Sequence, residues 1–330
     1  MSDVEMDPIR WGILSTALIN TKVLRGAALT ASAEIRAVAS RTSRAATQFA
    51  REWGIPVSYG TYDALLEDPA IEAVYIPLPN GLHHEWTMRA LHAGKHVLCE
   101  KPYSRHPTEV IEAFDLAEEN GLVLSEAYMY RYNPQILRLT DLVASGEIGE
   151  LRMINSSFTW PTDAPGDVRL DPTLDGGSLL DVGCYCVNAA RLLAGEPTTA
   201  NAQWKIGPTG VEVQMVGTLR FEGDVMLHFD SGFHLPDRSA LEVVGTIATV
   251  RVNDPWHCLE PRLDIVPQVG QPRSETTQLA NSYQLELEEF AAAVRSRPSI
   301  LLGRRDAVGQ ARTLAALIEA AASERAVAIR

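Results

Sequence analysis

The sequence has little cysteine, no long apolar run and no excess of basic residues. Four cysteines in 330 residues are too few for the disulfide framework of a small secreted protein. No apolar run approaches the roughly 18 residues that a membrane-spanning helix needs. The 29 basic residues are outnumbered by 42 acidic ones, which gives a net charge of −13. This balance argues against a nucleic-acid-binding protein and against adhesion to an anionic membrane.

Signals for metal binding and for secretion are also missing. Cys184 and Cys186 are two residues apart, and no second pair has zinc-ligand spacing. We therefore expect no metal site and interpret the cysteines as free thiols in a reducing compartment. The stretch Met1–Asp7 is acidic and polar, unlike a secretory signal. The expected location is the cytoplasm.

The first part of the chain alternates between strand-like and helix-like stretches. At roughly 150 residues per domain, the length corresponds to about two domains. Strands that are apolar on both faces and alternate with helices predict a parallel sheet covered by helices. The expected strands are Ile9–Leu14, Ile35–Ala39, Ala73–Ile76, His96–Cys99 and one from Val123, and the expected helices are Thr21–Thr30, Ala45–Trp53, His83–His92 and one from Thr108 to about Asn120.

After about Tyr128, strand-like stretches follow one another without helices between them, which predicts an antiparallel or mixed sheet. The expected strands are Leu151–Trp160, Asn201–Ile206, Val211–Phe221, Val225–Phe233, Leu241–Val244 and Thr249–Val252, and the expected helices are Pro134–Ser145, Ser178–Leu193, Ser282–Arg295 and Ala307–Ser323. We predict an α/β Rossmann domain with a parallel sheet over residues 1–128. An α+β domain with a large, mostly antiparallel open sheet, for substrate binding and oligomerisation, follows over residues 129–330, and its terminal helices are able to pack back on the first domain.

A turn of small residues, Gly12–Ile19, follows the first strand. A dinucleotide site needs a tight turn, small residues where the pyrophosphate approaches the backbone, and a helix N-terminus. Small residues in this place also occur in α/β proteins that bind no dinucleotide. We interpret Gly12, Ser15, Thr16 and Ala17 as candidate pyrophosphate contacts.

The second strand ends in Ser40–Arg44, a segment without Asp or Glu. A site that prefers NAD usually has a carboxylate here for the ribose 2′-hydroxyl. Guanidinium groups instead bind a phosphate through paired, charge-assisted hydrogen bonds. Ser40, Arg41 and Arg44 therefore favour NADP(H), and the alternative is a pair of solvated surface arginines.

Three longer blocks carry a family resemblance. Ile76–His83 and Ala93–Pro102, which contains Gly-Lys-His-Val-Leu-Cys-Glu-Lys-Pro, are followed in the second half by Gly176–Tyr185. These blocks resemble the Gfo/Idh/MocA oxidoreductases, named for glucose–fructose oxidoreductase and inositol dehydrogenase. With the nucleotide turn and the terminal helices, the resemblance spans essentially the whole chain.

One position in the third block indicates a branch of that family. Tyr185 stands where the inositol dehydrogenase group has histidine. The sequence there, together with Asp167–Pro172 and Glu126–Arg131, looks like the branch of dimeric dihydrodiol dehydrogenases, NADP-dependent xylose dehydrogenases and sugar 3-ketoreductases. Ser15 and Ala17 depart from the family's commoner glycines.

The resemblance implies further contacts to the cofactor and an assembly. It places the cofactor beside Pro77, Leu78, Pro79, Asn80, His83, Glu100 and Lys101. It also implies a cis peptide bond between Lys101 and Pro102, and a homodimer or homotetramer formed through the C-terminal sheet. For His83 the alternative is an ordinary capping or surface histidine.

Alcohol oxidation requires hydride and proton removal together. A phenol ionises near pH ~10, and a nearby ammonium lowers that value. We expect Lys101 and Tyr185 to meet beside the nicotinamide, with Tyr185 as the main proton donor or acceptor and Lys101 as its electrostatic partner; the reverse assignment stays open. Asp181, one helical turn before Tyr185, would hold Lys101 or substrate hydroxyls. Gly183 weakens this helix by ~1 kcal/mol, which predicts an irregular turn.

Other residues have two interpretations. Arg131 and Arg169 are candidate substrate contacts, although a salt bridge is a common fate of arginine. Trp160 is either a stacking surface for a sugar ring or a core residue. The run Glu286–Glu289 indicates a solvated helical face.

The sequence therefore predicts a cytoplasmic NADP(H)-dependent oxidoreductase acting on a sugar, keto-sugar or cyclic polyol. It would interconvert a hydroxyl and a carbonyl or lactone. One alternative is a non-catalytic dinucleotide sensor, which has no need of Lys101, Asp181 and Tyr185. The other is a redox-assisted glycosidase with tightly held NAD, which Arg41 and Arg44 disfavour.

Overall fold

The computed structural model describes residues 7–330, which form two compact units. Unit 1 consists of the chain up to Ser104 with Thr108–Met129 and Asn281–Ala307. Unit 2 consists of Arg105–Pro107, Tyr130–Ala280 and Val308–Arg330. All but the last residue of the stretch that we compared with a secretory signal lies outside the described residues. The division of the chain at residues 128 and 129 stays a proposal about its functional parts.

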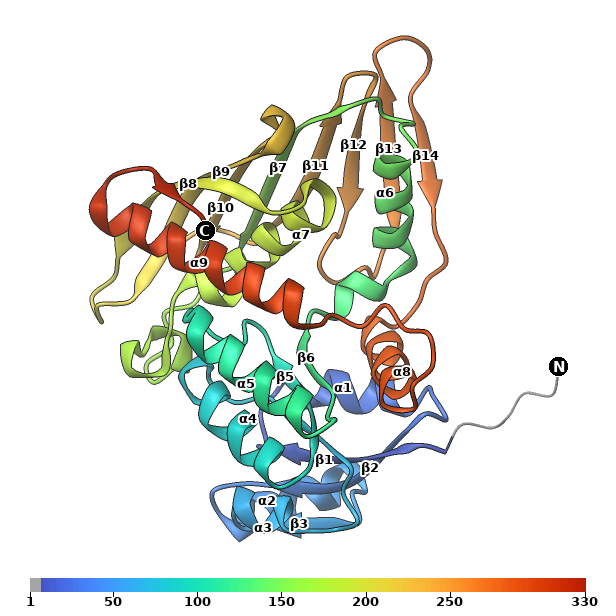
Figure 1. Cartoon of the computed structure of the whole chain (residues 1–330), viewed down its shortest axis with the longest axis vertical. Coiled ribbons are helices and arrows are strands. Elements are labelled where there is room, and N and C mark those ends of the chain that lie inside the picture. Colours follow the sequence, from blue (N-terminus) through green and yellow to red (C-terminus); the bar gives the residue numbers. More distant parts are fainter. Residues whose placement is uncertain (1–6) are drawn as a thin grey trace, which may run out of the picture. The chain divides into compact units, whose positions relative to one another are not determined.

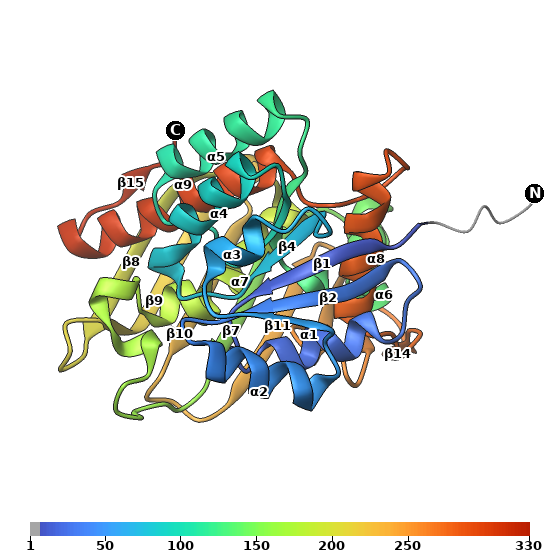
Figure 2. The ribbon, with the colours of Figure 1, turned by 90° about the horizontal axis from the view of Figure 1, so that it is seen from below.

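Unit 1 is built on a parallel sheet of six strands in the order β3-β2-β1-β4-β5-β6. Figures 1 and 2 show these strands with helices around them. The order reverses between β1 and β4, and ligands of such sheets bind at the carboxyl ends of the strands beside this reversal. The elements are β1 (Ile9–Leu14), β2 (Ala33–Ala39), β3 (Val57–Tyr59), β4 (Ala73–Ile76), β5 (His96–Glu100), β6 (Leu124–Ala127), α1 (Asn20–Ala27), α2 (Ser43–Trp53), α3 (Tyr62–Leu66), α4 (His83–His92), α5 (Pro107–Glu119) and α8 (Ser282–Val294).

The central strands of this sheet are buried on both faces. Every residue of β1 except Arg10 is buried, and all four residues of β4 are buried, because helices cover both faces of a parallel sheet. A Cβ at Gly12 would lie 2.5 Å from Leu65 Cδ2. Glycine therefore lets α3 approach β1 closely.

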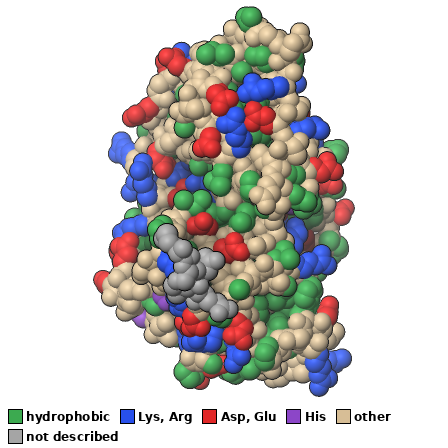
Figure 3. Space-filling view, turned by 90° about the vertical axis from the view of Figure 1, so that its right-hand side faces the viewer, with side chains coloured by type: hydrophobic (Ala, Val, Ile, Leu, Met, Phe, Trp, Pro, Cys, Tyr) green, Lys and Arg blue, Asp and Glu red, His purple; other side chains and the backbone are tan. Residues whose placement is uncertain are grey.

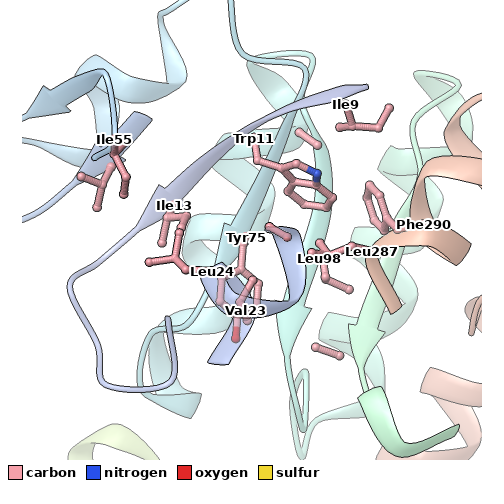
Figure 4. Packing of buried hydrophobic residues seen from close by; sticks show 14 of the residues in the cluster. Ile9, Trp11, Ile13, Val23, Leu24, Ile55, Tyr75, Leu98, Leu287 and Phe290 are labelled. Carbon is pink, nitrogen blue, oxygen red and sulfur yellow. The ribbon is translucent and has the colours of Figure 1, made fainter. Parts of the chain in front are cut away.

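The core of unit 1 joins the start of the chain to a helix near its end. Trp11 of β1 faces Phe290 of α8 with ring centroids 4.8 Å apart (Figure 4). A Cβ at Gly26 would lie 2.7 Å from the backbone nitrogen of Gln284, so α1 and α8 are in close contact. The expected solvated face at Glu286–Glu289 is wrong at Glu286, because this packing leaves that side chain only 2% exposed.

Unit 2 contains a sheet of nine strands in the order β14-β13-β12-β11-β7-β10-β9-β8-β15. The pair β7–β10 is parallel and the other neighbours are antiparallel. The predicted pair of sheets, one parallel and one mostly antiparallel, is confirmed. The elements are β7 (Leu151–Thr159), β8 (Pro197–Ile206), β9 (Glu212–Phe221), β10 (Met226–Gly232), β11 (Arg238–Gly245), β12 (Ala248–Asn253), β13 (Arg262–Pro267), β14 (Arg273–Thr276), β15 (Val327–Ala328), α6 (Pro134–Ala144), α7 (Cys184–Ala194) and α9 (Arg304–Ser323).

Side chains alternate between the two faces of this sheet. Leu219 and Phe221 are buried, whereas Met226 and His228 are exposed, as the period of two in the sequence predicts. Helices α6 and α7 lie over one face of this sheet, which we call the inner face (Figure 1). In the view of Figure 3, acidic and basic side chains are intermixed on the molecular surface. No helix of the described residues is both long and apolar enough to cross a membrane.

In place of the single predicted helix Ser178–Leu193, the structure has two consecutive helical segments. Residues Leu179–Gly183 form a π-helix, and α7 follows from Cys184. A Cβ at Gly183 would lie 2.9 Å from Ser231 Oγ, so glycine lets this turn lie tightly on β10. The irregular turn that Gly183 predicts is confirmed, and π-helical turns often occur at functional sites.

Candidate active site

In the turn after β1, a serine adopts a backbone conformation that glycine usually adopts. Ser15 has φ 144°, a conformation that favours glycine and costs other residues on the order of 1–3 kcal/mol. Its hydroxyl lies 3.3 Å from Pro77 O and accepts a hydrogen bond from the Ala17 backbone nitrogen at 3.1 Å. Asn20 Nδ2 donates to Ser15 O at 2.8 Å. These bonds fix the small-residue turn before α1, where the sequence predicts the pyrophosphate.

The end of β2 presents guanidinium groups and hydroxyls. Ser40 is buried, while Arg41 and Arg44 are exposed. The Thr42 side chain caps α2 by accepting a hydrogen bond from the Ala45 backbone nitrogen. A helix N-terminus with two exposed arginines and no carboxylate is chemically suited to a phosphate dianion. The donor set therefore fits the 2′-phosphate of NADP(H).

His83 is fully buried in unit 1, so it is not a surface histidine. Its Nδ1 lies 2.9 Å from Pro102 O, and its Nε2 lies 2.8 Å from Leu78 O. Burial lowers the pKa of His83, against the two backbone hydrogen bonds. The ring thus ties the segment after β4 to the segment after β5. Its predicted contact with the cofactor stays a prediction.

The segment that carries Lys101 is held on both sides. Tyr75 donates a hydrogen bond to Glu100, and Glu100 Oε2 accepts one from the Lys101 backbone nitrogen at 3.3 Å. Glu126 Oε1 accepts one from the Tyr103 backbone nitrogen at 2.7 Å. The bond between Lys101 and Pro102 is cis, as the resemblance implies. The backbone around Lys101 is therefore fixed at the carboxyl end of β5.

The sequence analysis assigned two further residues beside this segment, Tyr283 and Glu286, to no site. Burial raises the pKa of Glu286 well above its ordinary value, and the Glu100 charge adds to this effect. Burial likewise raises the pKa of Tyr283. Both lie on α8, about 180 residues after Glu100, so no local pattern in the sequence reveals them.

In unit 2, three predicted substrate residues come together. Trp160 Nε1 donates to Asp181 Oδ2 at 3.1 Å, and Arg169 Nε lies 3.2 Å from the same oxygen. The Arg169 guanidinium lies 5.1 Å from the centre of the Trp160 ring. Asp167, which the analysis quoted without assigning a role, binds Arg169 NH1 at 3.2 Å. Trp160 is thus half-buried and part of a polar cluster, and Asp181 is already oriented.

Two glycines let this cluster form. A Cβ at Gly176 would lie 2.4 Å from Arg169 O, and Gly177 has φ 139°. The Gly177 backbone nitrogen donates to Arg169 O at 3.0 Å. The Gly-Gly pair therefore brings the chain that carries Arg169 against the start of the π-helix that carries Asp181.

Tyr185 lies at the start of α7 among aromatic rings. Its ring centroid is 5.7 Å from Tyr130, 5.5 Å from Phe158 and 5.8 Å from Trp256. The side chain is only 7% exposed. The sequence analysis did not single out Phe158 or Trp256, which come from β7 and the loop after β12. Their rings surround the phenol ring with apolar surface.

Arg131 contacts a buried amide side chain in unit 2. Arg131 NH1 donates to Asn188 Oδ1 at 2.9 Å, and the Tyr130 hydroxyl donates to the same oxygen at 2.7 Å. The predicted substrate contact of Arg131 stays a prediction. Lys101 belongs to unit 1 and Tyr185 to unit 2, so their expected meeting also stays a prediction. The described residues contain no cluster of three His, Cys, Asp or Glu suited to a metal.

Comparison with known proteins agrees with this architecture. Residues 9–128 match the oxidoreductase family with an NAD-binding Rossmann fold, and residues 136–251 match the GFO/IDH/MocA C-terminal domain. The fold and the site thus define a Rossmann-type oxidoreductase. The chain belongs to the Gfo/Idh/MocA family.

Similar proteins include D-xylose 1-dehydrogenase (NADP(+)) 2 of Haloferax volcanii, which is 37% identical over 96% of this chain and 98% of its own length. Trans-1,2-dihydrobenzene-1,2-diol dehydrogenase of Sus scrofa is 33% identical over 76% of each chain. A 3-ketoreductase of Actinomadura kijaniata, KijD10, solved with NADP and TDP-benzene, is 31% identical with a TM-score of 0.89 and covers 95% of this chain and 98% of its own. The predicted resemblance is confirmed.

Proposed function

We propose that this chain is an NADP(H)-dependent oxidoreductase that interconverts a hydroxyl and a carbonyl or lactone on a sugar, keto-sugar or cyclic polyol. The observation that carries the proposal is the anchored backbone around Lys101 at the carboxyl end of β5. The relatives support the reaction class, because their names are those of a xylose dehydrogenase, a dihydrodiol dehydrogenase and a sugar 3-reductase.

NADP(H), when bound, accepts or supplies the hydride. Ser40, Arg41 and Arg44 would hold the 2′-phosphate, and the turn with Ser15 would hold the pyrophosphate. The preference for NADP(H) agrees with the cofactor in the name of the xylose dehydrogenase and in the solved 3-ketoreductase. The remaining proposed contacts are Gly12, Thr16, Ala17, Pro77, Leu78, Pro79, Asn80, His83 and Glu100.

Tyr185 transfers the proton to or from the substrate oxygen, and Lys101 acts as its electrostatic partner or co-donor. The apolar rings around Tyr185 restrict water near the phenol, which strengthens the electrostatic effect of a nearby charge. The solved 3-ketoreductase variants replace one tyrosine by Phe and one lysine by Ala or Glu. These are the residue types to which we assign proton transfer.

Substrate hydroxyls are oriented by Asp181, which Trp160 and Arg169 hold through one oxygen. Charge-assisted hydrogen bonds that substrate hydroxyls donate to a fixed carboxylate give both affinity and direction. Trp160 offers its ring to a sugar, and Arg131 and Arg169 offer donors. These side chains would bind the hydroxyls and the ring face that sugars have in common.

The chain is proposed to act in the cytoplasm as a homodimer or homotetramer. All four cysteines are buried thiols outside any disulfide, which suits a reducing compartment. On the outer face of the nine-stranded sheet, Met153 and Met226 are paired neighbours that are 41% and 44% exposed. Val216 and Val266 add apolar area to strands of the same sheet, which supports burial of this face against a second copy.

The test is NADPH absorbance over a panel of sugars, keto-sugars and dihydrodiols, followed by Lys101→Met and Tyr185→Phe. We expect each substitution to lower kcat by about 100-fold or more, while the exposed Lys205→Met control stays near wild type. Wild-type-like turnover in both variants would refute this mechanism. Nucleotide binding without turnover on any compound would favour the sensor, and glycoside hydrolysis by protein purified with bound NAD would favour the glycosidase.

A further inference from the structure

A buried carboxylate contacts the start of the π-helix, which carries Asp181 and leads into α7 with Tyr185. Glu212, the first residue of β9, is only 9% exposed. Its Oε1 accepts a hydrogen bond from Ser178 Oγ at 2.6 Å, and its Oε2 accepts one from the Leu179 backbone nitrogen at 2.8 Å. The carboxylate therefore holds both residues with which the π-helix begins.

A second hydroxyl extends this network to the neighbouring strand. Ser231 of β10 is fully buried, and its Oγ lies 2.9 Å from Ser178 Oγ. When Glu212 is ionised, Ser178 donates its single hydroxyl hydrogen to the carboxylate and accepts one from Ser231. Two strands of the sheet are thereby connected to one turn of the helix.

Two glycines make room for the network. A Cβ at Gly177 would lie 3.3 Å from Glu212 Oε2, and a Cβ at Gly183 would lie 2.9 Å from Ser231 Oγ. These glycines bracket the π-helix and let both polar side chains approach it. The same segment of sequence thus supplies Asp181 and the space for the side chains that hold its backbone.

We propose that Glu212 is a positioning residue, whose ionised carboxylate fixes the π-helical turn and thereby aims Asp181 and Tyr185 at the substrate. The inference rests on the proposed function, because it takes Asp181 and Tyr185 as residues that touch the substrate. A carboxylate accepts stronger hydrogen bonds than a neutral acid does. Protonation of Glu212 therefore loosens the Leu179 bond and lowers turnover.

Glu212 changes its protonation state near neutral pH. Burial raises the pKa of Glu212 to about 7, although the hydrogen bonds from Ser178 and Leu179 lower it. The titratable side chains on the adjoining elements are Lys205 on β8, Asp181 on the π-helix, Cys184, Tyr185, Cys186 and Arg191 on α7, and His228 and Asp230 on β10.

The test compares Glu212→Ala, Glu212→Gln and the control Glu222→Gln, an exposed acid at the other end of β9. We expect Glu212→Ala to lower kcat by about 10- to 100-fold, as misplacement by about 1 Å does, with NADPH affinity unchanged. Glutamine keeps an acceptor for Leu179 but resembles the protonated acid. The kcat of Glu212→Gln should therefore equal that of the wild type near pH 6 and lack the several-fold rise that the wild type shows between pH 6 and 8.

Hydrogen exchange of residues 177–185 separates this inference from the proposed function. In Glu212→Ala the Leu179 amide should exchange at least about 10-fold faster, even if no sugar is turned over. Unchanged exchange and unchanged kcat in that variant would overturn the inference. If the alanine variant does not fold, identical pH profiles of the wild type and Glu212→Gln would overturn it.

Discussion

Glu212→Gln should change how the stability of the protein depends on pH. In the folded protein, burial raises the pKa of Glu212 from its ordinary 4.5 to about 7. The folded state then binds this proton more tightly than the unfolded state does, so the contribution to stability is full below pH 4.5 and is lost as pH rises through 7. At about 1.4 kcal/mol per pH unit, the loss amounts to about 3 kcal/mol.

A glutamine at position 212 causes no such loss of stability at high pH, since it is neutral at every pH. The free energy of unfolding of Glu212→Gln, measured with urea at pH 5, 6, 7 and 8, should therefore gain on the wild type by about 2.5 kcal/mol between pH 5 and pH 8. Glu222→Gln, at an exposed site, should follow the wild-type curve. Parallel curves for the wild type and Glu212→Gln would refute the reasoning. A confirmed gain would mean that the ionised form is kept for function at a cost in stability.

Two other predictions concern the cofactor and the assembly. Arg41→Ala and Arg44→Ala should each raise KM for NADP(H) by about 10- to 100-fold, because each removes a charge-assisted contact, and should leave KM for NAD(H) unchanged. Arg51→Ala, further along α2, is the control. A wild type that prefers NAD would contradict the assignment. Met153→Lys with Met226→Lys should shift the oligomer to monomer in light scattering, because paired ammonium groups on adjacent strands oppose burial of this face. An unchanged mass would place the interface elsewhere.

Elements whose structure depends on near neighbours in the chain were predicted with accurate bounds. Helix His83–His92 is predicted to the residue, and β1 and β4 likewise, because periodicity and Gly or Pro boundaries are local signals. Several elements were not predicted, namely β3, α3, β13, β14 and β15. They are short or rich in polar residues, so their pairing with neighbouring strands defines them more than their own pattern does.

The sequence likewise identified individual site residues but not the contacts between them. Arg41 and Arg44 were identified from their place after β2, and Trp160, Arg169 and Asp181 were identified as separate candidates. Their joining at Asp181 Oδ2 was not predicted, since it depends on the close approach that Gly176 and Gly177 permit.

The sequence by itself determined the family, the order of the longer strands and helices, the donor set of the nucleotide site and the weak helical turn at Gly183. Only the tertiary structure decided the environment of the acids. Glu212 and Glu286 look like ordinary acids of a strand and a helix, yet both are buried. Burial is set by elements distant in sequence that pack over a side chain, and removal of water, rather than residue type, shifts the pKa of each carboxyl group.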